Sequence, residues 1–377
     1  MTTANHDPSS VPSAANRFGW DYRQKAKELG SPVGAGTDGL GIIDVHSHIN
    51  GTAAAEIYKS AARAFGIGLT YTQTRLDQAD NVRAVLGDTV RFVAVPNFAN
   101  PDKHRGFCED YLEQLEIWRT KYGSRMMKLW NAPRLRELIP AEQHGDIIEL
   151  DSPWRRRQAA RAVELGMMIM THVSDPDTWF ATKYSDAQKY GTKLDQYRGL
   201  RVMLNEFKVP WVLAHMGGWP EDLNFLDALL TAHPNANLDT SATKWIVRAL
   251  SSHEDSAFHA FFSKWKGRIH FGSDIVTTDD HVTPKDRRAQ PNMSIFSDLA
   301  DSPEAAFDLY ASRYWSLRAM FESAYDGESP IADPDLAMVE PSKYDAMSAP
   351  RLRGRSLPKE TLRAIYFENA SRIFRDW

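Results

Sequence analysis

Short β-prone segments alternate with helical patterns along this chain from residue 40 onward. Apolar runs typical of buried strands lie near residues 40–46, 67–72, 91–97, 125–130, 167–172, 209–215, 235–240 and 268–273. Helical periodicity occupies segments between them, near residues 53–65, 76–86, 107–121, 154–165 and 223–232. This alternation indicates parallel strands joined by crossover helices. Eight such units predict an α/β fold closed into a (β/α)8 TIM barrel.

Two regions lie outside this pattern. Residues 1–39 form an N-terminal extension that we expect to be partly disordered, with a short helix at residues 22–29 stopped by Gly30. Residues 326–356 are rich in Pro, Ser, Asp and Arg, and they lie between helices expected near residues 303–325 and 358–374. We interpret them as a long loop excursion over the barrel or as an oligomer contact. The catalytic domain is therefore predicted to span residues 40–377.

Composition excludes several classes of protein. A length of 377 residues suits a single α/β barrel. The formal net charge of −4 argues against a nucleic-acid-binding protein, which would usually be basic. No stretch approaches a membrane span, and the first residues lack the apolar core of a secretory signal. We therefore expect a cytoplasmic protein, and the single Cys108 excludes an internal disulfide.

Potential metal ligands stand at the ends of several predicted strands. Side chains two apart in a strand share a face, so His46 and His48 project together from the end of the first strand. Two later apolar runs end in His172 and His215, and the last one ends in Asp274. The carboxyl ends of parallel strands meet at one rim of a barrel. Imidazoles and carboxylates gathered there predict a site for a divalent metal ion.

The motifs around these residues resemble those of a known family. They are residues 43–48 (IDVHSH), 171–173 (THV), 214–218 (AHMGG), 271–274 (FGSD) and 369–374 (NASRIF). With these motifs in this order, the chain from about residue 40 to the C-terminus resembles the amidohydrolase superfamily. Within it, the chain looks like the amidohydrolase-related branch that includes aminocarboxymuconate-semialdehyde decarboxylase.

The resemblance implies a role for each matching residue. His46, His48, His172 and Asp274 would hold one divalent metal ion, for which we expect Zn²⁺, together with a bound water. His215 would be the catalytic partner that orients this water or stabilises developing charge, and Asp274 would also accept a proton.

A buried carboxylate beside the first motif could serve a ligand indirectly. Asp44 stands two residues before His46, so by strand alternation it shares the face of that histidine. It is expected either to anchor a ligand's second nitrogen or to form a salt bridge.

Lys128, in the fourth predicted strand, has two possible roles. In binuclear members of the superfamily, a lysine at the end of this strand is carboxylated and bridges two metals. The branch that this chain resembles generally uses one metal, so we expect one ion and an amine that binds substrate. Other predicted substrate contacts follow strand ends: Trp130, Arg134 and Trp219, with Asp175, Asp177, Trp179 and Arg248 as further candidates.

The sequence therefore predicts a metal-dependent enzyme with a small-molecule substrate. We expect a hydrolase that uses metal-activated water on an amide, lactone or ester-like bond of a carboxylated substrate. The alternative is a non-oxidative, metal-dependent decarboxylase (a carboxy-lyase) of an aromatic or enoic acid. A barrel that has lost catalysis and only binds ligands is disfavoured, because every expected ligand position is filled. We expect no nucleic-acid or membrane partner, and a homo-oligomer, a dimer.

Overall fold

Eight parallel strands form the centre of the molecule, as the alternation of patterns predicts. The computed structural model describes residues 14–32, 41–284 and 299–375. The strands occur in the predicted order: β1 (Ile42–His48), β2 (Ile67–Thr72), β3 (Val90–Phe92), β4 (Met126–Trp130), β5 (Met168–His172), β6 (Trp211–Leu213), β7 (Ala236–Asp239) and β8 (Ile269–His270). Each pairs in parallel with its sequence neighbours within two groups, β3-β2-β1 and β4-β5-β6-β7-β8.

Backbone hydrogen bonds join these two groups into a closed ring. On one side the amide of Ala94 donates to Met126 (2.9 Å) and the amide of Lys128 donates to Ala94 (2.7 Å). On the other side the amide of Val45 donates to Phe271 (2.9 Å). A further strand, β9 (Ile275–Val276), continues past β8 and pairs with the end of β1. The predicted (β/α)8 barrel is confirmed.

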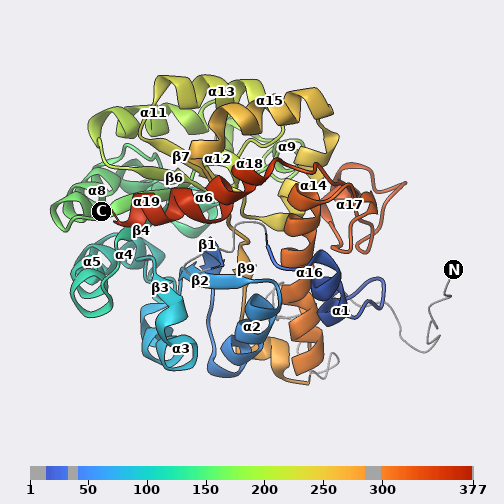
Figure 1. The fold of residues 1–377 in the computed structure, drawn as a ribbon. Helices are drawn as coiled ribbons and strands as arrows, with labels where there is room; N and C mark the ends of the chain where they lie inside the picture. Colours follow the sequence, from blue (N-terminus) through green and yellow to red (C-terminus); the bar gives the residue numbers. More distant parts are fainter. Residues whose placement is uncertain (1–13, 33–40, 285–298, 376–377) are drawn as a thin grey trace, which may run out of the picture.

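Helices surround the strands on the outside of the ring (Figure 1). The helical segments are α1 (Tyr22–Leu29), α2 (Thr52–Ala64), α3 (Ala79–Leu86), α4 (Lys103–Phe107), α5 (Glu109–Tyr122), α6 (Leu135–Leu138), α7 (His144–Ile147), α8 (Pro153–Glu164), α9 (Asp177–Phe180), α10 (Ala187–Tyr190), α11 (Gln196–Glu206), α13 (Leu223–Ala232), α14 (Thr243–Ser252), α15 (Asp255–Trp265), α16 (Pro303–Glu322), α17 (Asp335–Val339), α18 (Lys359–Arg363) and α19 (Asn369–Arg375). The segment labelled α12 (Ala214–Gly217) is a buried turn directly after β6, in which His215 and Met216 have left-handed backbone angles.

Two predicted helices are interrupted. The helix expected over residues 107–121 breaks at Cys108, whose backbone angles (φ −106°, ψ −90°) are not helical, and so divides into α4 and α5. The last helix contains a π-helical turn at Ala364–Glu368 between α18 and α19. In this turn the carbonyl of Ile365 accepts the amide of Phe271 (3.0 Å), which ties the end of the chain to the barrel.

Apolar side chains close the N-terminal end of the barrel interior. Ile43, Met126 and Met168, at or near the starts of their strands, form one buried cluster with Ile373 and Phe374 of α19. The ring of Phe374 stacks on Tyr71 with a centroid distance of 3.7 Å. Helix α19 therefore plugs this end, and the opposite end is left to polar groups.

The N-terminal extension and the excursion at residues 326–356 pack against outer helices. Helix α1 covers the predicted residues 22–29 and lies beside α16 (Figure 1). The excursion contains an antiparallel pair, β10 (Asp326–Glu328) and β11 (Arg351–Arg353), with α17 between the two strands. It contacts α9 and α14, which follow β5 and β7 on the side of the strands' carboxyl ends.

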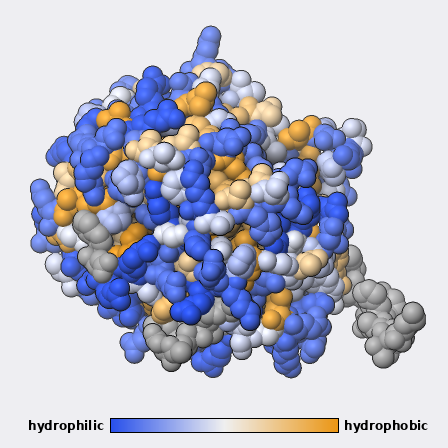
Figure 2. Space-filling view, turned by 45° about the horizontal axis from the view of Figure 1, so that its top comes forward, coloured by the Kyte–Doolittle hydropathy of each residue, from blue (hydrophilic) through white to orange (hydrophobic). Residues whose placement is uncertain are grey.

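The face in Figure 2 is predominantly hydrophilic, with hydrophobic side chains in small groups among the polar ones. Among the described residues, no helix is both long and apolar enough to cross a membrane.

Candidate active site

Three predicted metal ligands lie together at the carboxyl ends of β1 and β8. The Oδ1 atom of Asp274 is 3.4 Å from His46 Nε2 and 3.1 Å from His48 Nε2. Ligands that bind Zn²⁺ at about 2.0–2.2 Å lie roughly 3–3.5 Å from one another, so the donor atoms fit a metal ion. The side chains of His48 and Asp274 are 30% and 25% exposed, which leaves the cluster open to water or substrate.

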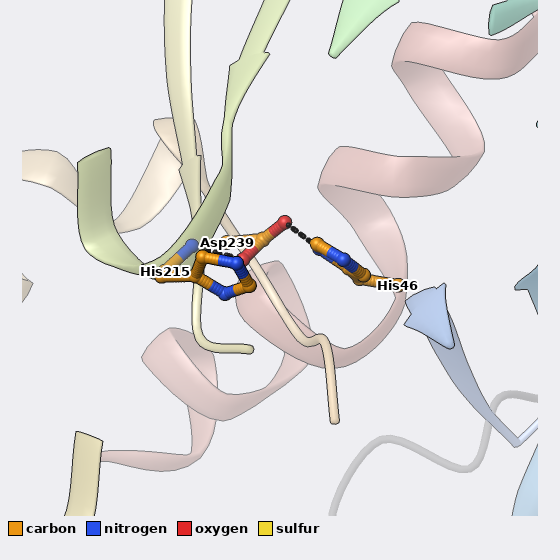
Figure 3. Close-up of side chains that lie close together, drawn as sticks. All are labelled: His46, His215 and Asp239. Atoms are coloured by element: carbon orange, nitrogen blue, oxygen red, sulfur yellow. Dashed lines mark hydrogen bonds and ion pairs between the residues drawn. The ribbon is translucent and has the colours of Figure 1, made fainter. Parts of the chain in front are cut away.

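A second carboxylate, Asp239 at the end of β7, contacts the other nitrogen of His46. Its Oδ2 accepts a hydrogen bond from His46 Nδ1 (2.8 Å), as Figure 3 shows. Its Oδ1 accepts the amides of His215 (2.9 Å) and Ser241 (3.0 Å) and the Ser241 hydroxyl. Asp239 is fully buried and these donors occupy its oxygens. We therefore interpret it as an anchor for His46 and not as a metal ligand.

The electrostatic surroundings of His46 determine which of its two ring nitrogens carries the proton. Burial, reinforced by the charge of Lys128, lowers the pKa of His46 to about 4, so its ring is neutral at neutral pH. Burial alone would raise the pKa of Asp239, but its interactions with His46 and the hydrogen bond from Ser241 hold it well below its usual range. The proton of His46 is therefore on Nδ1, and the lone pair of Nε2 faces His48 and Asp274.

The anchoring role expected of Asp44 belongs to Asp239. Asp44 accepts hydrogen bonds from the hydroxyls of Ser273 (2.6 Å) and Tyr314 (2.9 Å). Within the described ranges, no histidine ring or cationic side chain pairs with it. The pairing register of β1 shifts between Asp44 and Ser47, so the strict alternation behind the expectation fails there. Burial raises the pKa of Asp44 to about 7. It joins β1 to the end of β8 and to α16.

His172 and His215 contact each other beside this cluster. The Nδ1 atom of His172 lies 3.1 Å from His215 Nε2, and the ring of His215 lies 5.0 Å from that of His46. Burial, reinforced by the charge of His172, lowers the pKa of His215 well below its usual value. His172 is the one predicted ligand outside the group formed by His46, His48 and Asp274. The assignments of His172 as ligand and His215 as catalytic residue remain predictions.

Left-handed backbone conformations position several of these side chains. Among the described non-glycine residues with positive φ, His215 (59°), Met216 (51°), Ala242 (63°) and Asp274 (59°) all follow β6, β7 or β8. Such conformations cost roughly 1–3 kcal/mol each and persist where the surrounding structure enforces them. Their concentration at one end of the barrel indicates a functional site there.

Lys128 reaches into the same group of side chains. It is 2% exposed, and its Nζ lies 3.4 Å from His46 Nε2. Burial lowers its pKa to about 8, although Asp239 and Asp274 oppose this shift. The hydroxyl of Tyr111 donates to the Lys128 carbonyl (2.8 Å), which holds the strand in place. An amine therefore lies directly beside the predicted metal ligands.

The other predicted substrate contacts are in different surroundings. Trp130 is half-buried, and its ring lies edge-on to His172 at 6.4 Å. Arg134 is exposed and lies 3.5 Å from Glu137, one turn along the chain. Trp219 stacks on Tyr197 (5.8 Å) among outer helices, and its indole N–H donates to Asp177. Trp130 is therefore the aromatic residue of this set that the structure places beside a site histidine.

A different tryptophan, Trp245 of α14, lies against His215. Its ring is edge-on to the imidazole at 5.7 Å and contacts Trp179 at 5.4 Å. Asp335 of the excursion accepts both indole N–H groups at 2.9 Å. No local sequence pattern predicts a role for Trp245, because its place depends on a carboxylate 90 residues further along the chain.

Arg248, a candidate for an anionic substrate, is engaged by the excursion. Its guanidinium pairs with the fully buried Asp333 and donates to Thr178 (3.1 Å). This arginine holds the excursion against α9 and is not free for a ligand.

The chain belongs to the amidohydrolase family, whose model matches residues 43–375. This result confirms the resemblance that the five motifs indicate. A comparison with curated proteins finds no match.

Solved structures that are similar to this chain include two decarboxylases and an amidohydrolase. The 5-carboxyvanillate decarboxylase of Novosphingobium aromaticivorans, complexed with manganese and a nitrobenzoic acid, is 11% identical (TM-score 0.43), over 92% of this chain and 99% of that one. The 2,6-dihydroxybenzoate decarboxylase of Rhizobium is 12% identical (TM-score 0.41), over 71% of this chain and 98% of that one. A zinc-bound amidohydrolase of Burkholderia multivorans is 15% identical (TM-score 0.39), over 72% of this chain and 99% of that one.

Proposed function

We propose that this protein is a metal-dependent enzyme that acts on a small carboxylated substrate. The carrying observation is the open group of His46, His48 and Asp274 with the amine of Lys128 beside it. His46, His48, Asp274 and His172 would hold one divalent ion, for which Zn²⁺ is our first candidate. When bound, the ion supplies a Lewis acid that polarises a substrate oxygen or activates water.

Non-oxidative decarboxylation of an aromatic or enoic acid is the reaction that these surroundings favour. Lys128 provides a cation that pairs with a carboxylate. The rings of Trp130 and Trp245 flank His172 and His215, and such rings pack against a planar substrate. In this reaction the bond to the carboxyl carbon breaks, CO₂ leaves, and the substrate carbon takes a proton from a side chain or water.

Hydrolysis, which the sequence favoured, is the second candidate. It is supported by the imidazole of His215, beside His172 and near His46, which as a neutral base would accept a proton from an attacking water. Asp274, in the same group, is a second acceptor. The two reactions differ in their products, so they can be separated directly.

The test begins with the metal content of the purified protein. The metal-loaded enzyme is then assayed against hydroxybenzoates, enoic acids, lactones and N-acyl amino acids, with CO₂ and acid release both followed. We expect CO₂ from an aromatic or enoic acid, and its loss in Lys128→Met. Acid release without CO₂ would establish hydrolysis instead. A protein that neither contains nor takes up a metal would overturn both candidates.

A further inference from the structure

Both ring nitrogens of His172 are engaged by other side chains. Its Nε2 lies 2.9 Å from Oδ1 of Asp175, three residues further along the chain, and its Nδ1 lies 3.1 Å from His215 Nε2. The exposed fractions of His172 and Asp175 are 8% and 2%. The sequence suggested Asp175 as a substrate contact, but its oxygens are directed to side chains of the protein.

Asp175 is itself held firmly. Its Oδ2 accepts the hydroxyl of the buried Tyr184 (2.8 Å), and its backbone carbonyl accepts a hydrogen bond from Lys193. Both carboxylate oxygens therefore have a buried partner, so the direction from which Asp175 meets His172 is fixed.

This arrangement determines which nitrogen of His172 carries a proton. A carboxylate only accepts hydrogen bonds, so the proton of a neutral His172 is on Nε2. Its lone pair is then on Nδ1, the nitrogen on the side of His215 and away from Asp175. The other nitrogen of His215, Nδ1, lies 2.8 Å from the Ser241 hydroxyl oxygen.

The pair formed by His46 and Asp239 is similar, because a buried carboxylate again contacts one ring nitrogen of a histidine. The contacted nitrogen is Nδ1 in His46 and Nε2 in His172. Asp239 holds Nδ1 of His46 and leaves Nε2 for the metal cluster, whereas Asp175 holds Nε2 of His172 and leaves Nδ1. A carboxylate on the second nitrogen of a ligand histidine fixes its tautomer and orientation and raises its basicity.

We propose that Asp175 is a positioning residue that prepares Nδ1 of His172 as a metal ligand, supported by Tyr184. This inference rests on the proposed metal-dependent function, because it assigns a role toward the same ion. It predicts that metal affinity depends on a carboxylate that does not touch the metal.

The test compares Asp175→Asn with Asp186→Asn, which makes the same change at the exposed N-cap of α10, where Asn is an equally good cap. Zinc affinity is measured by competition with a chromophoric chelator, and the cobalt-substituted proteins are compared by visible absorption. We expect about 10–100-fold weaker zinc binding in Asp175→Asn, an altered cobalt spectrum, and wild-type behaviour in Asp186→Asn.

A second variant protects the test against misfolding. Tyr184→Phe keeps the carboxylate but removes its support, so we expect a smaller loss of affinity than in Asp175→Asn, in the same direction. Wild-type affinity and cobalt spectra in folded Asp175→Asn, or in Tyr184→Phe if Asp175→Asn does not fold, would overturn the inference while leaving the proposed function intact. Failure of the wild-type protein to bind zinc or cobalt would instead overturn the proposed function.

Discussion

The two ends of the barrel interior are built from opposite kinds of residues. At the N-terminal end, Met168, Phe374 and Tyr71 form an apolar cluster. At the C-terminal end, His46 and Asp239 are buried ionisable groups, and left-handed residues follow three strands. The first arrangement stabilises the fold through the burial of apolar surface. The second costs folding free energy and holds reactive groups in place, so the two ends should respond differently to substitution.

The largest expected effect is at the polar end, in Asp274→Ala. Removing this ligand should abolish both the bound metal and the metal-dependent activity, because the open cluster then has only His46 and His48. The melting temperature of the metal-free protein should fall only modestly, because Ala bears the left-handed conformation of residue 274 less well than Asp. Elemental analysis measures the metal content, and calorimetry measures the melting temperature. The control is Asp88→Ala, at an exposed residue in the turn before β3, at the opposite end of the barrel. Retention of the metal would show that Asp274 is not a ligand.

His215→Asn distinguishes a catalytic residue from a metal ligand within the polar end. Asn tolerates the left-handed conformation of residue 215, so the backbone is preserved. We expect the metal to remain bound while kcat falls by roughly 10²–10⁴-fold, the scale of a positioned acid or base. Kinetics and metal analysis of the same preparation are the measurements. Loss of the metal would mean that His215 is a ligand.

Phe374→Ala tests the apolar end. This ring is 7% exposed and stacks on Tyr71, so its removal should lower the free energy of unfolding by about 3–5 kcal/mol. Urea unfolding of the metal-free protein gives this value, and zinc affinity should be unchanged. A parallel loss of zinc affinity would show that the two ends are coupled.

Asp335→Asn is expected to have the smallest effect. The amide keeps the shape of the carboxylate, but it weakens the support that Trp179, Trp245 and Lys244 share. We expect a loss of about 1–3 kcal/mol in unfolding free energy. Binding of a hydroxybenzoate, measured by calorimetry, should weaken because Trp245 is less firmly held beside His215. Unchanged binding would show that the excursion does not contribute to binding of this ligand.

The strands were predictable because the pattern that specifies them is local. An apolar run bounded by turns predicts a strand, and β2 begins at Ile67 and ends at Thr72 as expected. The convergence of His46, His48 and Asp274 was also predictable, since parallel strand ends share one rim. The break at Cys108 was not, because the helical pattern continues through it.

The sequence by itself therefore determined the barrel, the family and the strand-end residues, all of which depend on periodicity and short motifs. Only the tertiary structure decided which carboxylate serves His46. Asp239 and His46 are 193 residues apart, and a register shift near the end of β1 turns the nearer Asp44 to other partners. The same holds for Trp245, which Asp335 positions from the excursion. Such pairs form only when distant segments pack, so no local pattern in the chain encodes them.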